Sequence, residues 1–146
     1  MGQRNQEIIN TLKQSHLFTR LTDVQLDRVY RHSQVVKLEE GQQLFAQGED
    51  VTNFYLVLSG KMKLYRVSPD GQEKIIEIVP QGGLFAEALM FMDQPHYPVS
   101  SAALSATTVI GIEANDFKDM LRDSVETCLL LLGNMSFRLR QLVHEI

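Results

Sequence analysis

Residues 82–91 carry the groups best suited to binding chemistry. Two adjacent glycines, Gly82 and Gly83, open a tight turn into a short helical segment, in which Glu87 is the one carboxylate among apolar side chains. Glycine-rich turns and helix N-termini bind anions, because unpaired backbone N–H groups point outward there. A bound phosphate usually also contacts a cation, most effectively the planar guanidinium of arginine. No Arg or Lys occurs between Gly82 and Val109, so the stretch predicts a phosphate pocket that lacks its positive charge.

Glu87 has two alternative roles. A carboxylate buried among Phe85, Leu89 and Phe91 needs hydrogen-bond donors, because its burial is otherwise costly. A ligand hydroxyl would supply a donor, and so would the backbone N–H groups of the neighbouring turn. The sequence favours neither alternative.

The remaining reactive residues form no known catalytic or metal motif. There is no G-x-S-x-G, no H-E-x-x-H and no nucleotide-hydrolase phosphate loop, so we expect no enzyme activity. The four histidines are widely separated: His16, His32, His96 and His144. Most are expected at the surface, but His16 precedes Leu17 and Phe18 and is therefore placed at an apolar boundary. The single cysteine excludes an internal disulfide and any four-cysteine metal site within one chain.

Length and charge narrow the class of protein. At 146 residues with 44% hydrophobic residues, the chain is long enough for one well-packed domain. It has no signal peptide and no apolar run near the roughly 20 residues of a membrane span, so a cytoplasmic location without membrane contact is expected. The net charge of −4 argues against direct nucleic-acid binding. Arg138 and Arg140 are interpreted as the solvated face of a helix rather than as DNA contacts.

The chain divides into helices over residues 1–33, strands over 34–114 and helices over 115–146. Thr22 and Gln25 are spaced as a capping box that starts a helix. The central part alternates short apolar runs with glycine-containing turns, such as residues 68–71. Such spacing is typical of an antiparallel sandwich or roll rather than of a parallel sheet.

The last helix is expected to pair with a second helix. Its apolar residues recur in steps of three and four, which is a heptad seam: Val125, Cys128, Leu132, Met135, Leu139, Leu142 and Ile146. Cys128 is thus interpreted as a small buried hydrophobe. Because further apolar residues lie outside this seam, the helix is apolar on two sides and needs two partners: Leu129, Leu130, Leu131 and Phe137. We expect a homodimer; the alternative is a helix buried in a monomer core.

Several motifs resemble a known family. The pattern from Leu38 to Glu49, with glycines at 41 and 48, is followed by residues 54–60 and by 83–92. Together they resemble the cyclic nucleotide-binding domain of the Crp/Fnr family of bacterial transcription regulators. Residues 68–75 and 85–93 are similar to the denitrification-regulator (DNR) branch.

The resemblance implies a fold and an assembly. The fold is mainly β: a jelly-roll-like antiparallel β-roll, flanked by short N-terminal helices and a long C-terminal dimerisation helix. The helix-turn-helix domain that reads DNA is absent from this chain, so DNA would be bound only through that domain. RNA polymerase is a further expected partner of the full-length protein.

The resemblance also limits the effector. In cyclic-nucleotide binders a Gly-Glu pair holds the ribose and an Arg-Ser pair holds the phosphate. Here Glu87 matches the glutamate, Ala86 replaces the glycine, and Tyr97 and Pro98 stand at the Arg and Ser positions. We therefore expect no cAMP binding, and the lone cysteine excludes the iron–sulfur cluster of Fnr-type sensors.

The DNR branch implies nitric oxide sensing through haem, with His16 as the candidate iron ligand, and control of denitrification genes. The expected effector pocket lies between the roll and the last helix and is formed by Phe85, Glu87, Leu89, Met90, Phe91, Tyr97, Leu130, Leu131 and Phe137. The alternative function is a module for haem or another small apolar molecule that signals through a protein partner without DNA.

Overall fold

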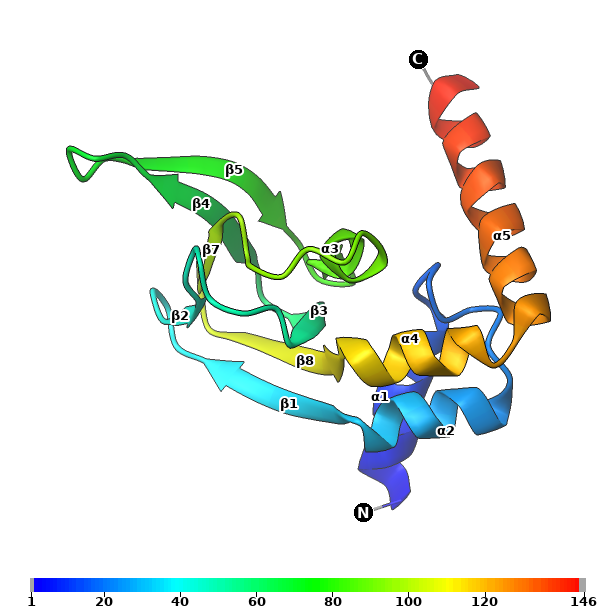
Figure 1. The fold of residues 1–146 in the computed structure, drawn as a ribbon. Coiled ribbons are helices and arrows are strands. Elements are labelled where there is room, and N and C mark those ends of the chain that lie inside the picture. Colours follow the sequence, from blue (N-terminus) through cyan, green and yellow to red (C-terminus); the bar gives the residue numbers. More distant parts are fainter. Residues whose placement is uncertain (1, 145–146) are drawn as a thin grey trace.

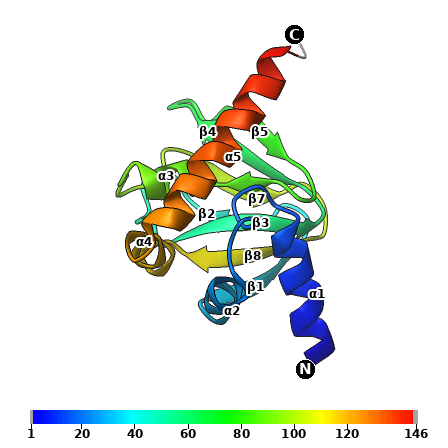
Figure 2. The ribbon, with the colours of Figure 1, turned by 90° about the vertical axis from the view of Figure 1, so that its right-hand side faces the viewer.

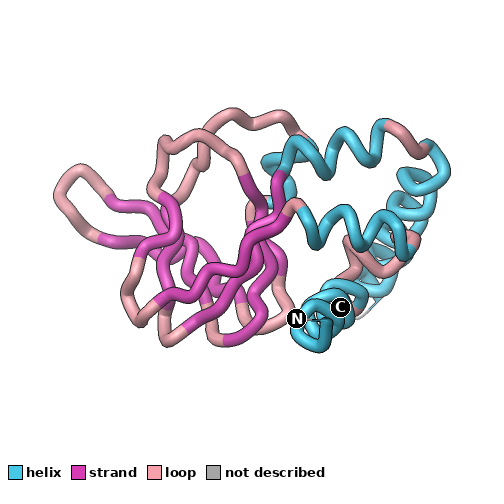
Figure 3. Tube along the Cα trace, turned by 90° about the horizontal axis from the view of Figure 1, so that it is seen from below, coloured by secondary structure: helices cyan, strands magenta, loops and turns pink. Residues whose placement is uncertain are grey.

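The computed structural model describes the backbone of residues 2–144 and the side chains of residues 6–144. The strands are β1 (Ser33–Leu38), β2 (Gln43–Phe45), β3 (Asn53–Ser59), β4 (Met62–Val67), β5 (Glu73–Val79), β6 (Leu84–Phe85), β7 (Ser100–Ala103) and β8 (Thr107–Glu113). The helices are α1 (Gly2–Lys13), α2 (Asp23–Arg31), α3 (Glu87–Phe91), α4 (Ala114–Arg122) and α5 (Val125–His144). Strands form one side of the molecule, and helices gather at the other (Figure 3).

The strands form the expected antiparallel roll. One sheet has the order β1-β8-β3-β6, the other has the order β2-β7-β4-β5, and every strand pair is antiparallel. β4 and β5 form a hairpin that projects away from the helices (Figure 1). Its turn contains Gly71 at φ +86°, a conformation that glycine adopts without steric cost. Alternate side chains of the two sheets point inward and fill the roll.

A second core joins the helices to the roll. Phe18, Phe54 and Phe117 are almost completely buried there, and their rings meet at centroid distances of 5.3–6.2 Å. The predicted capping box is present, because Thr22 Oγ1 accepts from Gln25 N and Gln25 Oε1 accepts from Thr22 N. Gln25 Nε2 also donates to Thr127 Oγ1 over 2.9 Å. This bond ties the start of α2 to the start of α5.

Helix α5 crosses the face of the roll and continues past it (Figure 2). Ser124 caps its first turn, since Ser124 Oγ accepts from Thr127 N. Only Thr127 and Leu131 of this helix are buried. Asn134 Nδ2 donates to the backbone oxygen of His16 over 3.0 Å. Between residues 2 and 144, no helix combines the length and the apolar character that crossing a membrane requires.

Candidate functional site

The glycine turn positions α3 as predicted. Gly82 has φ +85°, and its N–H donates to the oxygen of Val57, whose own N–H donates to the oxygen of Gly83. A Cβ on Gly83 would lie 2.6 Å from Val79 Cγ1, so the close approach needs a glycine there. Ala86 takes the left-handed conformation, φ 68°, at the N-cap of α3. A glycine would accept this conformation more easily.

Aromatic rings fill the interior of the roll beside this turn. The rings of Phe45 and Tyr97 stack with centroids 3.8 Å apart, and those of Tyr55 and Phe85 stack at 5.2 Å. Tyr97 Oη donates to the backbone oxygen of Asn53 over 2.9 Å. Burial raises the pKa of Tyr55, so this region excludes charge. Tyr97, which the resemblance matched to the family's arginine position, is buried and is therefore a core residue.

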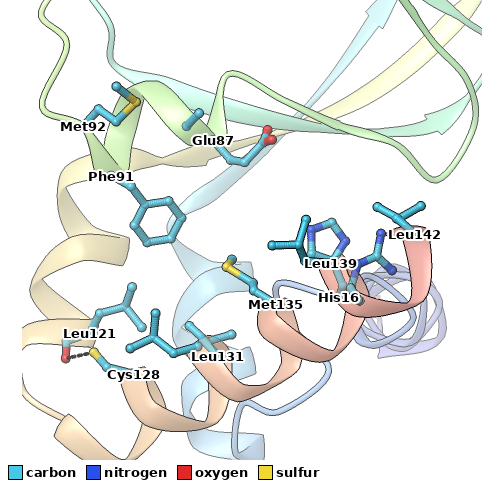
Figure 4. Close-up of a pocket in the computed structure, with 13 residues that line it drawn as sticks. His16, Glu87, Phe91, Met92, Leu121, Cys128, Leu131, Met135, Leu139 and Leu142 are labelled. Carbon is cyan, nitrogen blue, oxygen red and sulfur yellow. Dashed lines mark hydrogen bonds between the residues drawn. The ribbon is translucent and has the colours of Figure 1, made fainter. Parts of the chain in front are cut away.

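A cavity lies outside the roll, between α3 and α5. Its volume is about 670 Å³, within the range of about 300–1,000 Å³ that is usual for ligand pockets. Its lining is largely apolar and consists of His16, Glu87, Ala88, Phe91, Met92, Leu121, Cys128, Leu131, Leu132, Met135, Arg138, Leu139 and Leu142. Figure 4 shows Glu87 and Phe91 of α3 opposite Leu131, Met135 and Leu139 of α5.

The cavity includes four of the residues that sequence reasoning assigned to an effector site. Glu87, Phe91 and Leu131 line it, and so does the candidate iron ligand His16. It adds Ala88, Met92, Leu121 and Arg138, which sequence reasoning missed. For Arg138 a signal existed, because it follows Leu131 by seven residues and Met135 by three. That spacing places all three on one face of a helix.

The other predicted pocket residues lie elsewhere. Phe85, Met90 and Tyr97 are 2–3% exposed and belong to the packed cores, and Leu89 packs against the roll core. Leu130 and Phe137 are 41% and 61% exposed and do not line the cavity. With about 3.6 residues per turn, a residue next to Leu131 points well away from it. These six residues were predicted to form the effector pocket but do not line the cavity.

The ionisable groups of the cavity lie in two places. Glu87 Oε2 is buried without a hydrogen-bond partner. Burial, and then the charge of Glu77, raises the pKa of Glu87, and the backbone N–H of Glu87 partly opposes that rise. Burial and then the charge of Arg138 lower the pKa of His16. Arg138 thus acts on His16, whereas the side-chain charge that acts on Glu87 is that of Glu77.

The predicted dimer seam is divided between two sides of α5. Cys128, Met135 and Leu142 line the cavity, and Cys128 Sγ donates to the oxygen of Leu121 over 3.2 Å. Leu132 and Leu139 also reach the cavity rim but are 60% and 65% exposed. Val125 of the seam is 73% exposed. Leu129 and Val143, which are not in the predicted seam, are 63% and 62% exposed. Ile146 lies outside the described residues, and the dimer itself stays a prediction.

No cluster of three or more His, Cys, Asp or Glu side chains that could hold a metal ion occurs among the described residues. Of the histidines, only His16 lines the cavity. His32 Nδ1 lies 3.4 Å from Asp116, and His96 Nε2 lies 3.3 Å from Asp50. Any iron bound in the cavity would therefore rely on His16 and on groups of its own cofactor.

Comparisons with known proteins agree with this architecture. The sequence profile of the cyclic nucleotide-binding domain matches residues 35–124. The chain is 28% identical over 108 residues to the CRP-like cAMP-activated global transcriptional regulator of Mycobacterium tuberculosis, which covers 74% of this chain and 48% of that protein. It is 28% identical over 130 residues to the cyclic AMP receptor protein of Thermus thermophilus, a match that covers 89% of this chain and 60% of that protein. The chain thus spans about half of these curated relatives.

Two solved structures from Pseudomonas aeruginosa are more similar. The sensor domain of the transcriptional regulator DNR superposes with a TM-score of 0.83 at 37% identity, covering 97% of this chain and 95% of that one. The structure of DNR superposes with a TM-score of 0.88 at 38% identity, covering 94% of this chain and 60% of that one.

Proposed function

The chain belongs to the cyclic nucleotide-binding domain family, in its Crp/Fnr type and close to DNR, and from this premise we propose that it is the effector-sensing and dimerisation domain of a transcription regulator. We propose that it responds to nitric oxide through haem, and not to cAMP. The whole protein would then control denitrification genes, with DNA bound by a further domain of the regulator.

One observation carries this proposal: the apolar cavity joins α3 of the roll to α5. A ligand in it contacts both elements, because Phe91 lies on one wall and Leu131 and Met135 lie on the other. A ligand shifts a conformational equilibrium only through contacts that differ between the two states. Repacking of α5 against α3 would supply that difference and pass it along the helix to a second copy.

The cavity suits haem in two respects. Its lining is apolar, and His16 presents an imidazole, which is a common axial ligand of haem iron. When bound, haem iron would supply the diatomic-gas chemistry. The chain's own residues would exclude water and hold the imidazole. Asn134 would help by fixing the backbone of His16, because it donates to the carbonyl oxygen of that residue.

An absorption spectrum tests the cofactor. Addition of haem to the domain is expected to shift the Soret band, and nitric oxide should shift it again. His16→Ala is expected to change the spectrum of the bound haem, whereas His96→Ala, which alters a histidine outside the cavity, should not. Absence of a Soret shift in the unmodified domain would remove the haem proposal.

Calorimetry tests the exclusion of cAMP. We expect no heat of binding at micromolar cAMP, because the interior of the roll is packed with rings and Tyr97 stands where the family has its phosphate-binding arginine. Losing a charge-assisted hydrogen bond to phosphate removes about 1.5–3 kcal/mol for each bond. Binding with micromolar affinity would overturn this part of the proposal.

A further inference from the structure

Among the described side chains, Arg138 is the one arginine that lines the cavity. Within residues 6–144, Arg138 makes no ion pair or hydrogen bond with another side chain or backbone group. Three other arginines each bind a carboxylate: Arg28 with Asp116, Arg31 with Asp27, and Arg122 with Asp119. Arg138 therefore has a free guanidinium fork beside an apolar wall.

The opposite charge in the cavity is kept away from Arg138. Glu87 lies on α3, across the cavity from α5, and no ion pair joins it to Arg138 in the described residues. The cavity therefore has an acidic group on the α3 wall and a basic group on the α5 wall, with apolar side chains between them. A ligand that carries a carboxylate would be repelled by the first group and attracted by the second.

We propose that Arg138 is the anion-recognising residue of this cavity, so that its ligand is an amphipathic acid whose carboxylate lies at α5 and whose apolar body lies against Phe91, Leu131 and Met135. A guanidinium binds a carboxylate through two parallel N–H···O bonds, a geometry that lysine does not reproduce. If the proposed function is right, the acid is haem and the carboxylate is a propionate; a fatty acid has the same chemistry.

The first arm of the test uses haem and haem dimethyl ester, in which both propionates are blocked, titrated by absorption. The unmodified domain is expected to bind haem about tenfold more tightly than the ester, since blocking the propionates removes the charge-assisted hydrogen bonds to Arg138. Arg138→Leu should abolish this preference and Arg138→Lys should reduce it. Arg140→Leu is the matched control, because Arg140 is also exposed on α5 but does not line the cavity.

The second arm uses palmitate and methyl palmitate to displace a fluorescent apolar dye from the same four proteins. This arm tests the role of Arg138 even if no haem binds. Absence of haem binding would overturn the proposed function but not the role of Arg138. Preference for palmitate that depends on Arg138 would then identify a fatty-acid pocket. Equal binding of acid and ester in both arms, or a preference unchanged in Arg138→Leu, overturns the inference while leaving any Soret shift in place. Far-UV circular dichroism of each variant checks that the fold is kept.

Discussion

At the scale of residues, Glu87 determines one part of the pH dependence of stability. Its pKa is raised above the ordinary value of 4.5, mainly by burial. The folded state therefore holds this proton more tightly than the unfolded chain does. The contribution of Glu87 to the free energy of unfolding falls as pH rises from 4.5 through the raised pKa, and stays low above it. The pKa values of Asp70 and Asp93 are lowered, so their contribution to the free energy of unfolding is lost only as the pH falls below their ordinary value of 3.8.

We expect Glu87→Gln to stabilise the domain at pH 7 by about 1 kcal/mol, because it removes a charge whose Oε2 atom is buried without a hydrogen-bond partner. The gain should shrink as the pH is lowered towards 4.5, where the native carboxyl takes up its proton. Thermal unfolding of both proteins across this pH range measures the difference. Glu40→Gln, which changes an exposed carboxylate, should have little effect at either pH. A gain that does not depend on pH would contradict this account of Glu87.

At the scale of elements, α5 contains a helix-weakening residue with open space around it. A Cβ added to Gly133 would meet nothing within 4 Å. Alanine is favoured over glycine in a helix interior by about 1 kcal/mol. Gly133→Ala is therefore expected to raise the free energy of unfolding in urea by up to about 1 kcal/mol, measured over a series of protein concentrations.

The control for this prediction is Gly60→Ala. Gly60 has φ +86°, and its added Cβ would lie 2.4 Å from Thr107 Oγ1 and 2.6 Å from the oxygen of Ala106. This substitution should clearly destabilise the domain. If Gly133→Ala also destabilises it, and does so more strongly at high protein concentration, a second copy approaches the backbone of α5 at that point.

The elements also show what the sequence could predict. The Thr22–Gln25 capping box and the turn at Gly71 depend on residues close together in the chain, and both were predicted correctly. The face of α5 that points to the roll was predicted wrongly, because Leu130 and Phe137 are exposed instead of lining the cavity. A heptad pattern indicates which residues share a stripe, but α4 and the segment around His16 decide which stripe faces the cavity. The burial of Tyr97 likewise follows from ring packing between distant strands.

At the scale of the whole molecule, the exposed apolar side chains of α5 are the surface that we propose for the dimer. Val125, Leu129, Leu132, Leu139 and Val143 follow in steps of three, four and seven and remain exposed. A second copy of the chain would cover them. The fold class, the roll and the long helix followed from sequence pattern and resemblance together. Val125, Leu132 and Leu139 of this stripe belong to the predicted seam, whereas the inclusion of Leu129 and Val143 needed the structure.

Leu139→Glu is expected to convert the dimer into a monomer in sedimentation, because it places a charge in the stripe. Leu129→Glu should do the same, although the seam predicted from sequence leaves Leu129 out. Leu130→Glu changes an exposed leucine on another side of α5 and should leave the dimer intact. If dimers survive Leu129→Glu but not Leu139→Glu, the interface lies on the seam predicted from the sequence. If dimers survive both substitutions, the dimer interface does not lie on α5.

The attachment of α5 has a consequence for cooperativity. Thr127, Leu131 and Asn134 hold its first half to the body of the molecule, whereas residues 136–144 are exposed. The last turns are therefore expected to fray without opening either core, as a separate and less stable folding unit. A ligand that bridges α3 to the second half of the helix would join this unit to the rest of the fold. Sensing would then consist in making one cooperative unit out of two.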